Sequence, residues 1–97
     1  MVEFEWNPAK AASNLSKHKV SFDLAATVFQ DPFMRSFSDK DHGGFEERWI
    51  TLGHAQDRHL LVVSHTYSEM DNNNVFVRII SARRATRQER QQYETVK

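Results

Sequence analysis

The sequence predicts one α+β domain in which a mainly antiparallel sheet of about four to five strands carries two N-terminal helices and one C-terminal helix. Three observations support this fold class. Apolar residues recur at helical spacing twice before residue 32, β-branched and apolar runs dominate residues 33–82, and a helix-capping sequence follows them. A chain of 97 residues without internal repeats or linker-like stretches fits a single domain over residues 1–97.

The N-terminal third reads as a short strand and two helices. Phe4 and Trp6 alternate with acidic residues, which indicates a strand. Asn7-Pro8 is typical of a helix start, because Asn caps the first N–H groups and Pro lacks one. The first helix is expected over residues 8–17, and the apolar stripe we expect it to bury is Ala11, Ala12 and Leu15.

The second helix begins after Ser21, whose hydroxyl can cap it, and ends at Asp31-Pro32, because proline disfavours helix in the residue before it. Its apolar face follows the i, i+3, i+4, i+7 spacing of Phe22, Ala25, Ala26 and Phe29.

The remaining strands are expected over residues 33–38, 46–52, 59–67 and 75–82, with a polar turn at 39–44. Simple alternation along the last strand places Phe76, Arg78, Ile80 and Ala82 on one face. Thr86 and Glu89 have the spacing of a capping box, so a final helix is expected over residues 87–94. We expect the helices to pack against one face of the sheet.

The charge is balanced overall but unevenly distributed. Thirteen Lys and Arg match thirteen Asp and Glu, yet residues 21–47 carry a net charge of −4 and residues 82–97 a net charge of +3. Such asymmetry suits an anionic ligand at one end and a basic partner elsewhere, although an ordinary salt-bridged surface is the alternative.

Several function classes lack support. The chain has no Cys, which excludes disulfides, thiolate zinc sites and a cysteine nucleophile. No apolar run is long enough to cross a membrane and no signal peptide is present, so we expect a soluble, cytoplasmic protein. Phosphate-loop, dinucleotide, zinc-protease and hydrolase motifs are absent, and no cofactor is predicted.

Two groups of basic residues could bind an anion. Lys10, Asn14 and Lys17 share one face of the first helix, and His18 follows at its end; a solvated polar face is the alternative. Arg83 and Arg84 lie between the last strand and a helix N-terminus, a setting that favours phosphate.

Arg78 lies inside the last strand, which indicates either an open sheet face or pairing with a carboxylate such as Glu47. His65 lies in an apolar strand, where a hydrogen-bonded structural role competes with a catalytic one. His42, His54 and His59 with Asp41 and Asp57 match no established metal-ligand spacing, so no metal is predicted.

Several spaced segments together resemble the BrnT toxin family. The first is Phe4-Glu5-Trp6-Asn7-Pro8 continued by Lys10, Asn14 and Lys17-His18. Residues 22–32, Glu47-Arg48 with residues 50–53, and residues 61–66 follow, and the last segment runs from Arg78 to Tyr93. The resemblance spans nearly the whole chain. One departure is Lys19, where the family usually has a glycine as a left-handed helix cap, so that turn is expected to be strained or shifted.

The resemblance implies a RelE-like fold and a ribonuclease toxin of a type II toxin–antitoxin pair. It also implies a BrnA-type antitoxin, which neutralises the toxin and represses the operon through its own DNA-binding part. The partners expected are therefore this antitoxin and RNA, with operator DNA contacted only indirectly.

RNA cleavage without a metal needs a base for the 2′-OH, an acid for the leaving 5′-oxygen, and cations for the phosphoryl group. On this basis Arg83 and Arg48 are assigned to the phosphate, and His18 is the first candidate acid or base. The full predicted site is His18, Glu47, Arg48, His65 and Arg83 for catalysis, with Lys10, Asn14, Lys17, Arg78 and Arg84 contacting RNA.

Two other function classes compete with the toxin. A catalytically inactive module could bind the antitoxin and act only in operon regulation. A stand-alone DNA-binding protein has little support, because the basic helix is short and no helix-turn-helix pattern is present.

Overall fold

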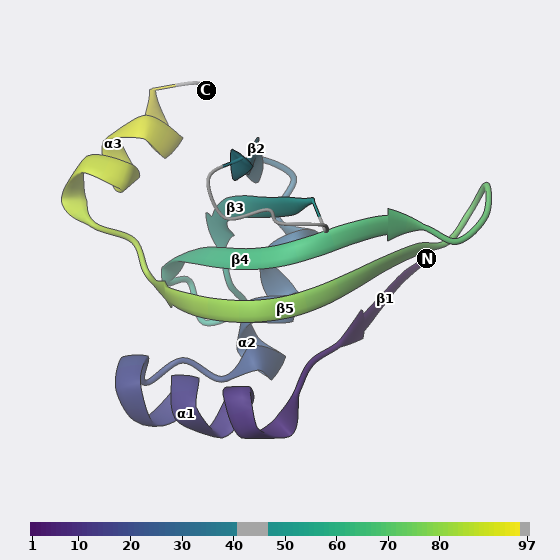
Figure 1. The fold of residues 1–97 in the computed structure, drawn as a ribbon. Helices are drawn as coiled ribbons and strands as arrows, with labels where there is room; N and C mark the ends of the chain where they lie inside the picture. Colours follow the sequence, from purple (N-terminus) through teal and green to yellow (C-terminus); the bar gives the residue numbers. More distant parts are fainter. Residues whose placement is uncertain (41–46, 96–97) are drawn as a thin grey trace.

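The computed structural model describes residues 1–40 and 47–95 as one five-stranded sheet with helices on both faces (Figure 1). The sheet order is β1-β5-β4-β3-β2, with β1 parallel to β5 and every other neighbouring pair antiparallel. The elements are β1 (Val2–Glu5), α1 (Pro8–His18), α2 (Phe22–Ala26), the 3₁₀ helix η1 (Thr27–Gln30), β2 (Arg35–Ser38), β3 (Arg48–His54), β4 (Leu60–Glu69), β5 (Val75–Arg84) and α3 (Arg87–Glu94). The predicted mainly antiparallel α+β fold is confirmed.

The predicted helix starts are also confirmed. The Asn7 side chain accepts hydrogen bonds from the backbone of Ala9 and Lys10, and the Ser21 side chain accepts one from Leu24. Thr86 and Glu89 form the complete capping box of α3. These contacts are local in sequence, which is why composition and spacing alone could predict them.

The expectation that all helices pack against one face is wrong. α1, α2 and η1 cover a core that contains Val28, Val63 and Ile79, whereas α3 brings Tyr93 against Leu52 and Val62 on the other face. Because cross-strand partners point to the same side, the sheet register fixes these two faces. We call them the helical face, which carries α1, α2 and η1, and the open face, of which α3 covers one end.

The simple alternation predicted for β5 is also wrong, because the strand contains a β-bulge. Ser64 pairs with Ser81 and His65 pairs with Ile79, so Ile80 is an extra residue on β5. After the bulge, the alternation of β5 side chains between the two faces of the sheet is shifted by one residue. Ala82 therefore joins Ile79 in the helical-face core, and Ser81 follows Arg78 on the open face.

α1 lies beside β5, on the side of that strand away from β4 (Figure 1). The residue that α1 buries is Asn14, which is 6 % exposed, whereas Leu15 is 49 % exposed. The predicted apolar stripe of α1 is therefore wrong at Ala12 and Leu15, which are both exposed, whereas Ala11 packs against the core. Among the described residues, no helix is long and apolar enough to cross a membrane.

Lys19 ends α1 in the left-handed conformation, with φ of 62° and ψ of 28°. Its backbone N–H donates to the carbonyl of Leu15, and its side-chain amine reaches the carbonyl of Ser16 at 3.1 Å. The turn keeps the geometry that a glycine cap would adopt, so the lysine occupies it with steric strain.

We expect Lys19→Gly to raise the free energy of unfolding by about 1 kcal/mol, because glycine adopts this conformation without strain. The melting temperature should rise by roughly 4–8 °C in a domain of this size. Lys19→Ala is the matched control, since alanine keeps a Cβ and should give no gain. Equal stabilisation by both substitutions in thermal unfolding would contradict the strain argument.

Candidate nucleic-acid interface

A polar groove of about 200 Å³ lies between α1 and β5. It brings together four of the residues that the sequence analysis singled out on the first helix, and adds side chains from β5. Its lining residues are Lys10, Ser13, Asn14, Lys17, His18, Ile80 and Ser81. Ile80, the extra residue of the bulge, and Ser81, which follows it on β5, both line the groove beside α1.

A row of charged and hydroxyl side chains crosses the open face beside this groove. Glu5, Arg78, Thr66 and Arg48 are successive cross-strand partners on β1, β5, β4 and β3. Arg48 and Arg78 are two strands apart, which places their Cα atoms on the order of 10 Å from each other. The next row contains Ser81 and Ser64, so the groove and the arginine row meet at Ser81.

Arg78 is half-exposed, and its Nε lies 3.8 Å from Oε1 of Glu5. The partner considered from sequence was Glu47, so the carboxylate beside Arg78 is a different one. Parallel pairing of β1 with β5 puts Glu5 opposite Arg78, and this register was not predicted. Since both side chains are close to half exposed to solvent, the pair is weak and can open to admit an anion.

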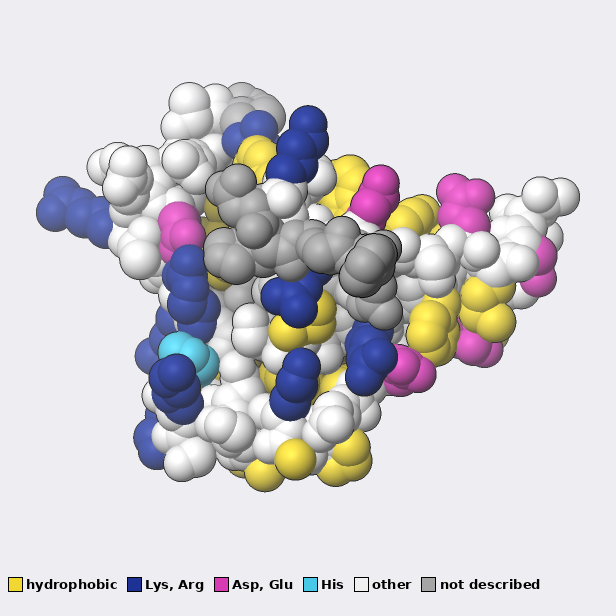
Figure 2. Space-filling model, viewed as in Figure 1, with side chains coloured by type: hydrophobic (Ala, Val, Ile, Leu, Met, Phe, Trp, Pro, Cys, Tyr) yellow, Lys and Arg dark blue, Asp and Glu magenta, His cyan; other side chains and the backbone are white. Residues whose placement is uncertain are grey.

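Basic side chains gather on the visible face of the molecule, beside α1 and over β4 and β5 (Figure 2). Acidic side chains lie mostly toward the end of the molecule formed by β1 and the β4–β5 hairpin (Figure 2). Basic and acidic side chains therefore occupy different regions of this visible face. A face with several Lys and Arg side chains and exposed hydroxyl groups is suited to a phosphodiester chain.

A model of the family described as "Ribonuclease toxin, BrnT, of type II toxin-antitoxin system" matches residues 6–89. The chain belongs to the BrnT family. The crystal structure of the ribonuclease toxin BrnT from Brucella abortus has the same fold, with a TM-score of 0.66 over 90 % of this chain and 100 % of that chain, at 17 % sequence identity. A search of curated protein sequences finds no match. The predicted family and fold are thus confirmed.

Arg83 is held by a carboxylate in this BrnT chain. Its Nη1 and Nη2 donate to Oε1 and Oε2 of Glu89, each at 2.8 Å. The hydrogen bonds from Arg83 outweigh partial burial and lower the pKa of Glu89 to about 2, and the same contact raises the pKa of Arg83. Glu89 also accepts from the backbone N–H of Thr86, so one carboxylate caps α3 and fastens it to β5.

Arg84 and Arg83 were predicted to act together, but they point to opposite faces of β5. Arg83 pairs with Val62 on the open face, and Arg84 pairs with Leu61 on the helical face. Arg84 therefore lies away from Arg48 and Arg78. Glu47 is exposed and directly precedes β3, so it is the neighbour of Arg48 in the chain.

His65 is 2 % exposed and lies on the helical face, opposite to the arginine row. Its Nδ1–H donates to the carbonyl of Thr66 at 3.0 Å, so Nε2 accepts from the Thr51 hydroxyl at 2.7 Å. Thr51 in turn accepts from Ser36 at 2.7 Å. Burial lowers the pKa of His65, only partly offset by the bond to Thr66. The structure therefore does not bring His65 together with the cationic residues.

The side-chain amide of Asn14 is fully used inside the protein. Its Nδ2 donates to the carbonyls of Val20 and Ala82 at 3.0 and 2.8 Å, and its Oδ1 accepts from the N–H of Ala82 at 3.1 Å. The Asn14 amide thus forms the two backbone hydrogen bonds with Ala82 that a neighbouring strand would form, and it fixes α1 against β5.

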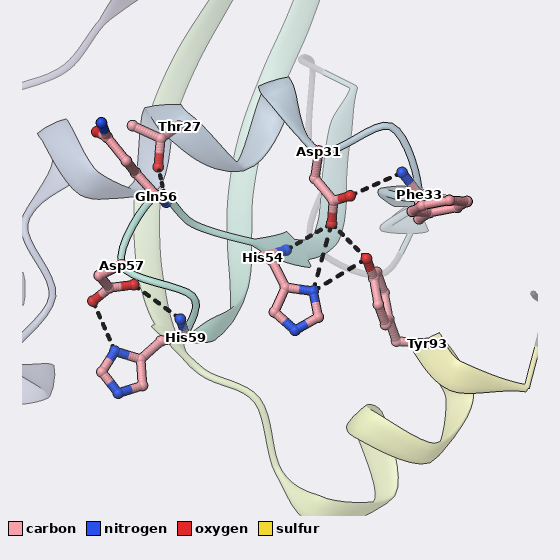
Figure 3. A network of polar contacts seen from close by, with 8 residues as sticks. All are labelled: Thr27, Asp31, Phe33, His54, Gln56, Asp57, His59 and Tyr93. Atoms are coloured by element: carbon pink, nitrogen blue, oxygen red, sulfur yellow. Dashed lines mark hydrogen bonds and ion pairs between the residues drawn. The ribbon is translucent and has the colours of Figure 1, made fainter.

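A partly buried polar network, which was not predicted from the sequence, joins the end of η1 to β3 and α3 (Figure 3). Asp31 accepts from the Tyr93 hydroxyl at 2.6 Å and from the N–H groups of His54 and Phe33. Burial would raise the pKa of Asp31, but these hydrogen bonds outweigh it and lower the pKa; burial and Asp31 raise the pKa of Tyr93 to about 12. Asp31 was read only as a helix stop, and no local pattern relates it to Tyr93.

The histidines considered as metal ligands have other partners. His54 Nδ1 lies 3.2 Å from the Tyr93 hydroxyl, and His59 Nδ1 lies 2.7 Å from Asp57 Oδ2 (Figure 3). Asp41 and His42 lie outside the described residues. Within residues 1–40 and 47–95, no group of three or more His, Asp or Glu side chains is arranged to hold a metal ion.

Asn14→Ala is expected to lower the free energy of unfolding by about 2–4 kcal/mol, because it leaves buried backbone groups of Ala82 and Val20 without partners. Ser13→Ala, at an exposed neighbouring position in the same groove, should change it by less than about 0.5 kcal/mol. Chemical denaturation of both variants measures the difference. A stable Asn14→Ala protein would show that α1 does not depend on this amide.

Glu89 should also give the protein a stability that depends on pH. Its pKa falls from 4.5 to about 2 on folding. The contribution of Glu89 to the free energy of unfolding is therefore fully present above about pH 4.5 and is lost as the pH falls toward 2. Glu89→Gln should be roughly 1–2 kcal/mol less stable at neutral pH and should lose less stability in that window. The free energies of unfolding of wild type and variant, measured by denaturation at a series of pH values, should converge near pH 2.

Glu94→Gln, an exposed substitution on the same helix, is the control and should follow the wild type. Asp31, Asp57 and Asp71 also have lowered pKa values, so some acid sensitivity will persist in Glu89→Gln. Parallel curves for wild type and Glu89→Gln would contradict the role given to this ion pair.

Proposed function

We propose that this chain is an endoribonuclease toxin that cleaves RNA on the open face of its sheet, without a metal ion, and so inhibits translation and growth. The observation that carries the proposal is the convergence at Ser81 of the α1 groove and the arginine row. Two lysines and a histidine on one side and two arginines on the other flank a surface of hydroxyl groups. Membership of a ribonuclease toxin family supports the same reaction.

The proposed chemistry uses the 2′-OH of the RNA as internal nucleophile. A base removes its proton, the 2′-oxygen attacks the adjacent phosphorus, and the bond to the 5′-oxygen breaks as an acid protonates that oxygen. His18 is our first candidate for acid or base, because it lines the groove together with Lys10 and Lys17. Glu47 is the second, because it is exposed beside Arg48.

Cations would stabilise the negative charge that develops on the phosphoryl oxygens. Arg48, Lys10 and Lys17 are the side chains that we assign to this task, and Arg78 can join them when its long contact with Glu5 opens. For Nη1 and Nη2 of Arg83 to bind a phosphate, they must first release the Glu89 carboxylate.

The other predicted residues take different places in this proposal. Asn14 positions α1, and His65 belongs to the buried hydrogen-bond chain of the helical face. Arg84 lies outside the proposed interface, because it points from the helical face.

A BrnA-type antitoxin is the proposed partner, since the family belongs to type II systems in which the toxin has a protein antitoxin. In this proposal the antitoxin neutralises the toxin and represses the operon through its own DNA-binding part, so this chain contacts operator DNA only indirectly. Its place of action is then the cytoplasm, where RNA and antitoxin are both present.

An inactive antitoxin-binding module is the second candidate, and one observation favours it. Two of the arginines predicted to bind phosphate already contact carboxylates, Arg83 at 2.8 Å and Arg78 at 3.8 Å. A copy that no longer binds RNA would have no need to keep these guanidinium groups available.

Cleavage of a labelled RNA by the purified chain, in the presence of excess EDTA, tests the reaction. Arg48→Ala and His18→Ala should each slow cleavage by roughly 10²-fold or more, because each removes a group needed only in the transition state. Arg87→Ala, an exposed arginine on α3, is the matched control and should cleave at the wild-type rate.

Loss of cleavage in EDTA that is restored by a divalent metal would contradict the metal-independent mechanism. Wild-type rates in both Arg48→Ala and His18→Ala would contradict the site assignment. A chain that binds the antitoxin yet never cleaves RNA, and does not arrest growth when expressed alone, would establish the inactive module instead.

A further inference from the structure

An apolar cavity of about 380 Å³ lies on the helical face, on the side of the sheet opposite to the proposed RNA interface. Its lining includes Phe29 of η1 and residues of all five strands. The cavity is lined by Val2, Phe29, Met34, Ser36, Trp49, His65, Tyr67, Val75 and Val77. Its volume lies in the range of about 300–1,000 Å³ that is typical of ligand sites.

The rim of this cavity exposes large apolar side chains. Val2 is 44 % exposed, Tyr67 45 % and Met34 39 %, and they come from β1, β4 and the segment before β2. Apolar side chains that gather around a concave surface are typical of an interaction site, whereas single exposed ones are ordinary. The proposed catalytic groups do not use this surface.

The polar atoms of the cavity lining indicate what kind of occupant fits. The hydroxyl and imidazole groups of Ser36 and His65 are engaged in the hydrogen-bond chain through Thr51. Trp49 is different, because its Nε1–H is buried and has no acceptor among the described residues. A buried donor without an acceptor costs about 1–3 kcal/mol, and a backbone carbonyl of a bound peptide segment can supply the acceptor only when the cavity lining shifts to expose Nε1.

The charge beside the cavity indicates which residues accompany the apolar group. Val2, Val75 and Glu69 are successive cross-strand partners, so Glu69 points to the same face as the cavity at its hairpin end. Glu69 is exposed, and it forms no ion pair with another described residue. A partner with Lys or Arg next to its apolar anchor complements this rim.

We infer that the helical-face cavity is the docking site for a segment of the antitoxin, one that inserts a large apolar side chain and places a basic residue near Glu69. This inference rests on the antitoxin partner of the proposed function and adds where that partner binds. Because the cavity and the arginine row lie on opposite faces of the sheet, the segment that anchors the antitoxin does not itself cover Arg48 or Arg78. Anchoring and inhibition are then carried out by different parts of the antitoxin.

Binding of this chain to the protein encoded by the neighbouring gene, measured by titration calorimetry, tests the site. Tyr67→Ser and Glu69→Lys should each weaken the affinity by about ten-fold or more, because they remove the apolar rim and reverse its charge. Both positions are exposed, so the variants should fold, and they should cleave RNA at the wild-type rate. Leu15→Ser, on an equally exposed apolar side chain of α1, is the matched control and should change the affinity by less than about two-fold.

The fluorescence of Trp49, which lines the cavity, reports on whether the cavity is occupied. Trp6 packs against Phe22 away from the cavity lining, so in a Trp6→Phe background the indole fluorescence reports Trp49 alone. Antitoxin binding should change the Trp49 emission in that background. When Tyr67→Ser is added to this background, a higher antitoxin concentration should be needed to reach the same change in emission.

The outcomes separate this inference from the proposed function. If the unaltered chain binds the antitoxin but Tyr67→Ser and Glu69→Lys bind equally well, the docking site is wrong and the partner stands. If the unaltered chain does not bind the antitoxin, the docking site and the proposed partner are both wrong. If the unaltered chain is a dimer that Tyr67→Ser converts to a monomer, the occupant is a second copy of this chain, which also overturns the inference.

Discussion

The hydrogen bonds between the Asn14 side chain and the backbone of Ala82 determine where the candidate site lies. β1 pairs with β5 only from Val75 to Arg78, so the rest of the β5 edge lacks a strand partner among the described residues. Asn14 both donates to and accepts from Ala82, as a neighbouring strand would. One turn on either side of Asn14, α1 carries Lys10 and Lys17, and the amide therefore places both lysines beside Ser81.

The bulge at Ile80 completes this arrangement. Without an extra residue, a strand with Ile79 in the core would also direct Ser81 into the core and Ala82 to the open face. With it, Ala82 packs in the core at the position where its backbone meets Asn14. Ser81 is exposed, lines the groove with the lysines, and lies in the cross-strand row next to that of Arg78. The alternative is costly, because a serine hydroxyl in the core would need its own partner.

Local features of the fold could be predicted from the sequence, and features that depend on register could not. The caps at Asn7, Ser21 and Thr86 involve residues two or three positions apart, so their spacing was sufficient. The contacts of Arg78 with Glu5 and of Asp31 with Tyr93 join residues that only the folded sheet brings together. Helical periodicity favoured burial of Leu15 over Asn14, because it counts apolar residues and cannot show which backbone groups need a partner.

The same distinction applies to the candidate site. Lys10, Lys17 and His18 were expected together because they share one helix face, and the structure places them in one groove. His65 and Arg48 were expected together because of their residue types, yet the register of β3 and β4 places them on opposite faces. The direction of a side chain from a strand depends on phase, which one bulge reverses, so residue type alone cannot group strand residues into a site.

The distribution of charge over the molecule bears on how a chain with no net charge could act on RNA, as proposed above. Nucleic-acid affinity depends on how many phosphates the cations neutralise, and a neutral molecule with a few local cations neutralises few of them. Here Lys10, Lys17 and His18 line the groove that contains Ser81, while the acidic side chains of the visible face lie mostly toward the hairpin end (Figure 2). The acidic end lowers attraction for RNA in general without reducing the number of cations at the groove. In the function proposed above, selectivity for RNA therefore comes from the geometry of the groove and the arginine row, and the acidic end is left for the proposed basic protein partner.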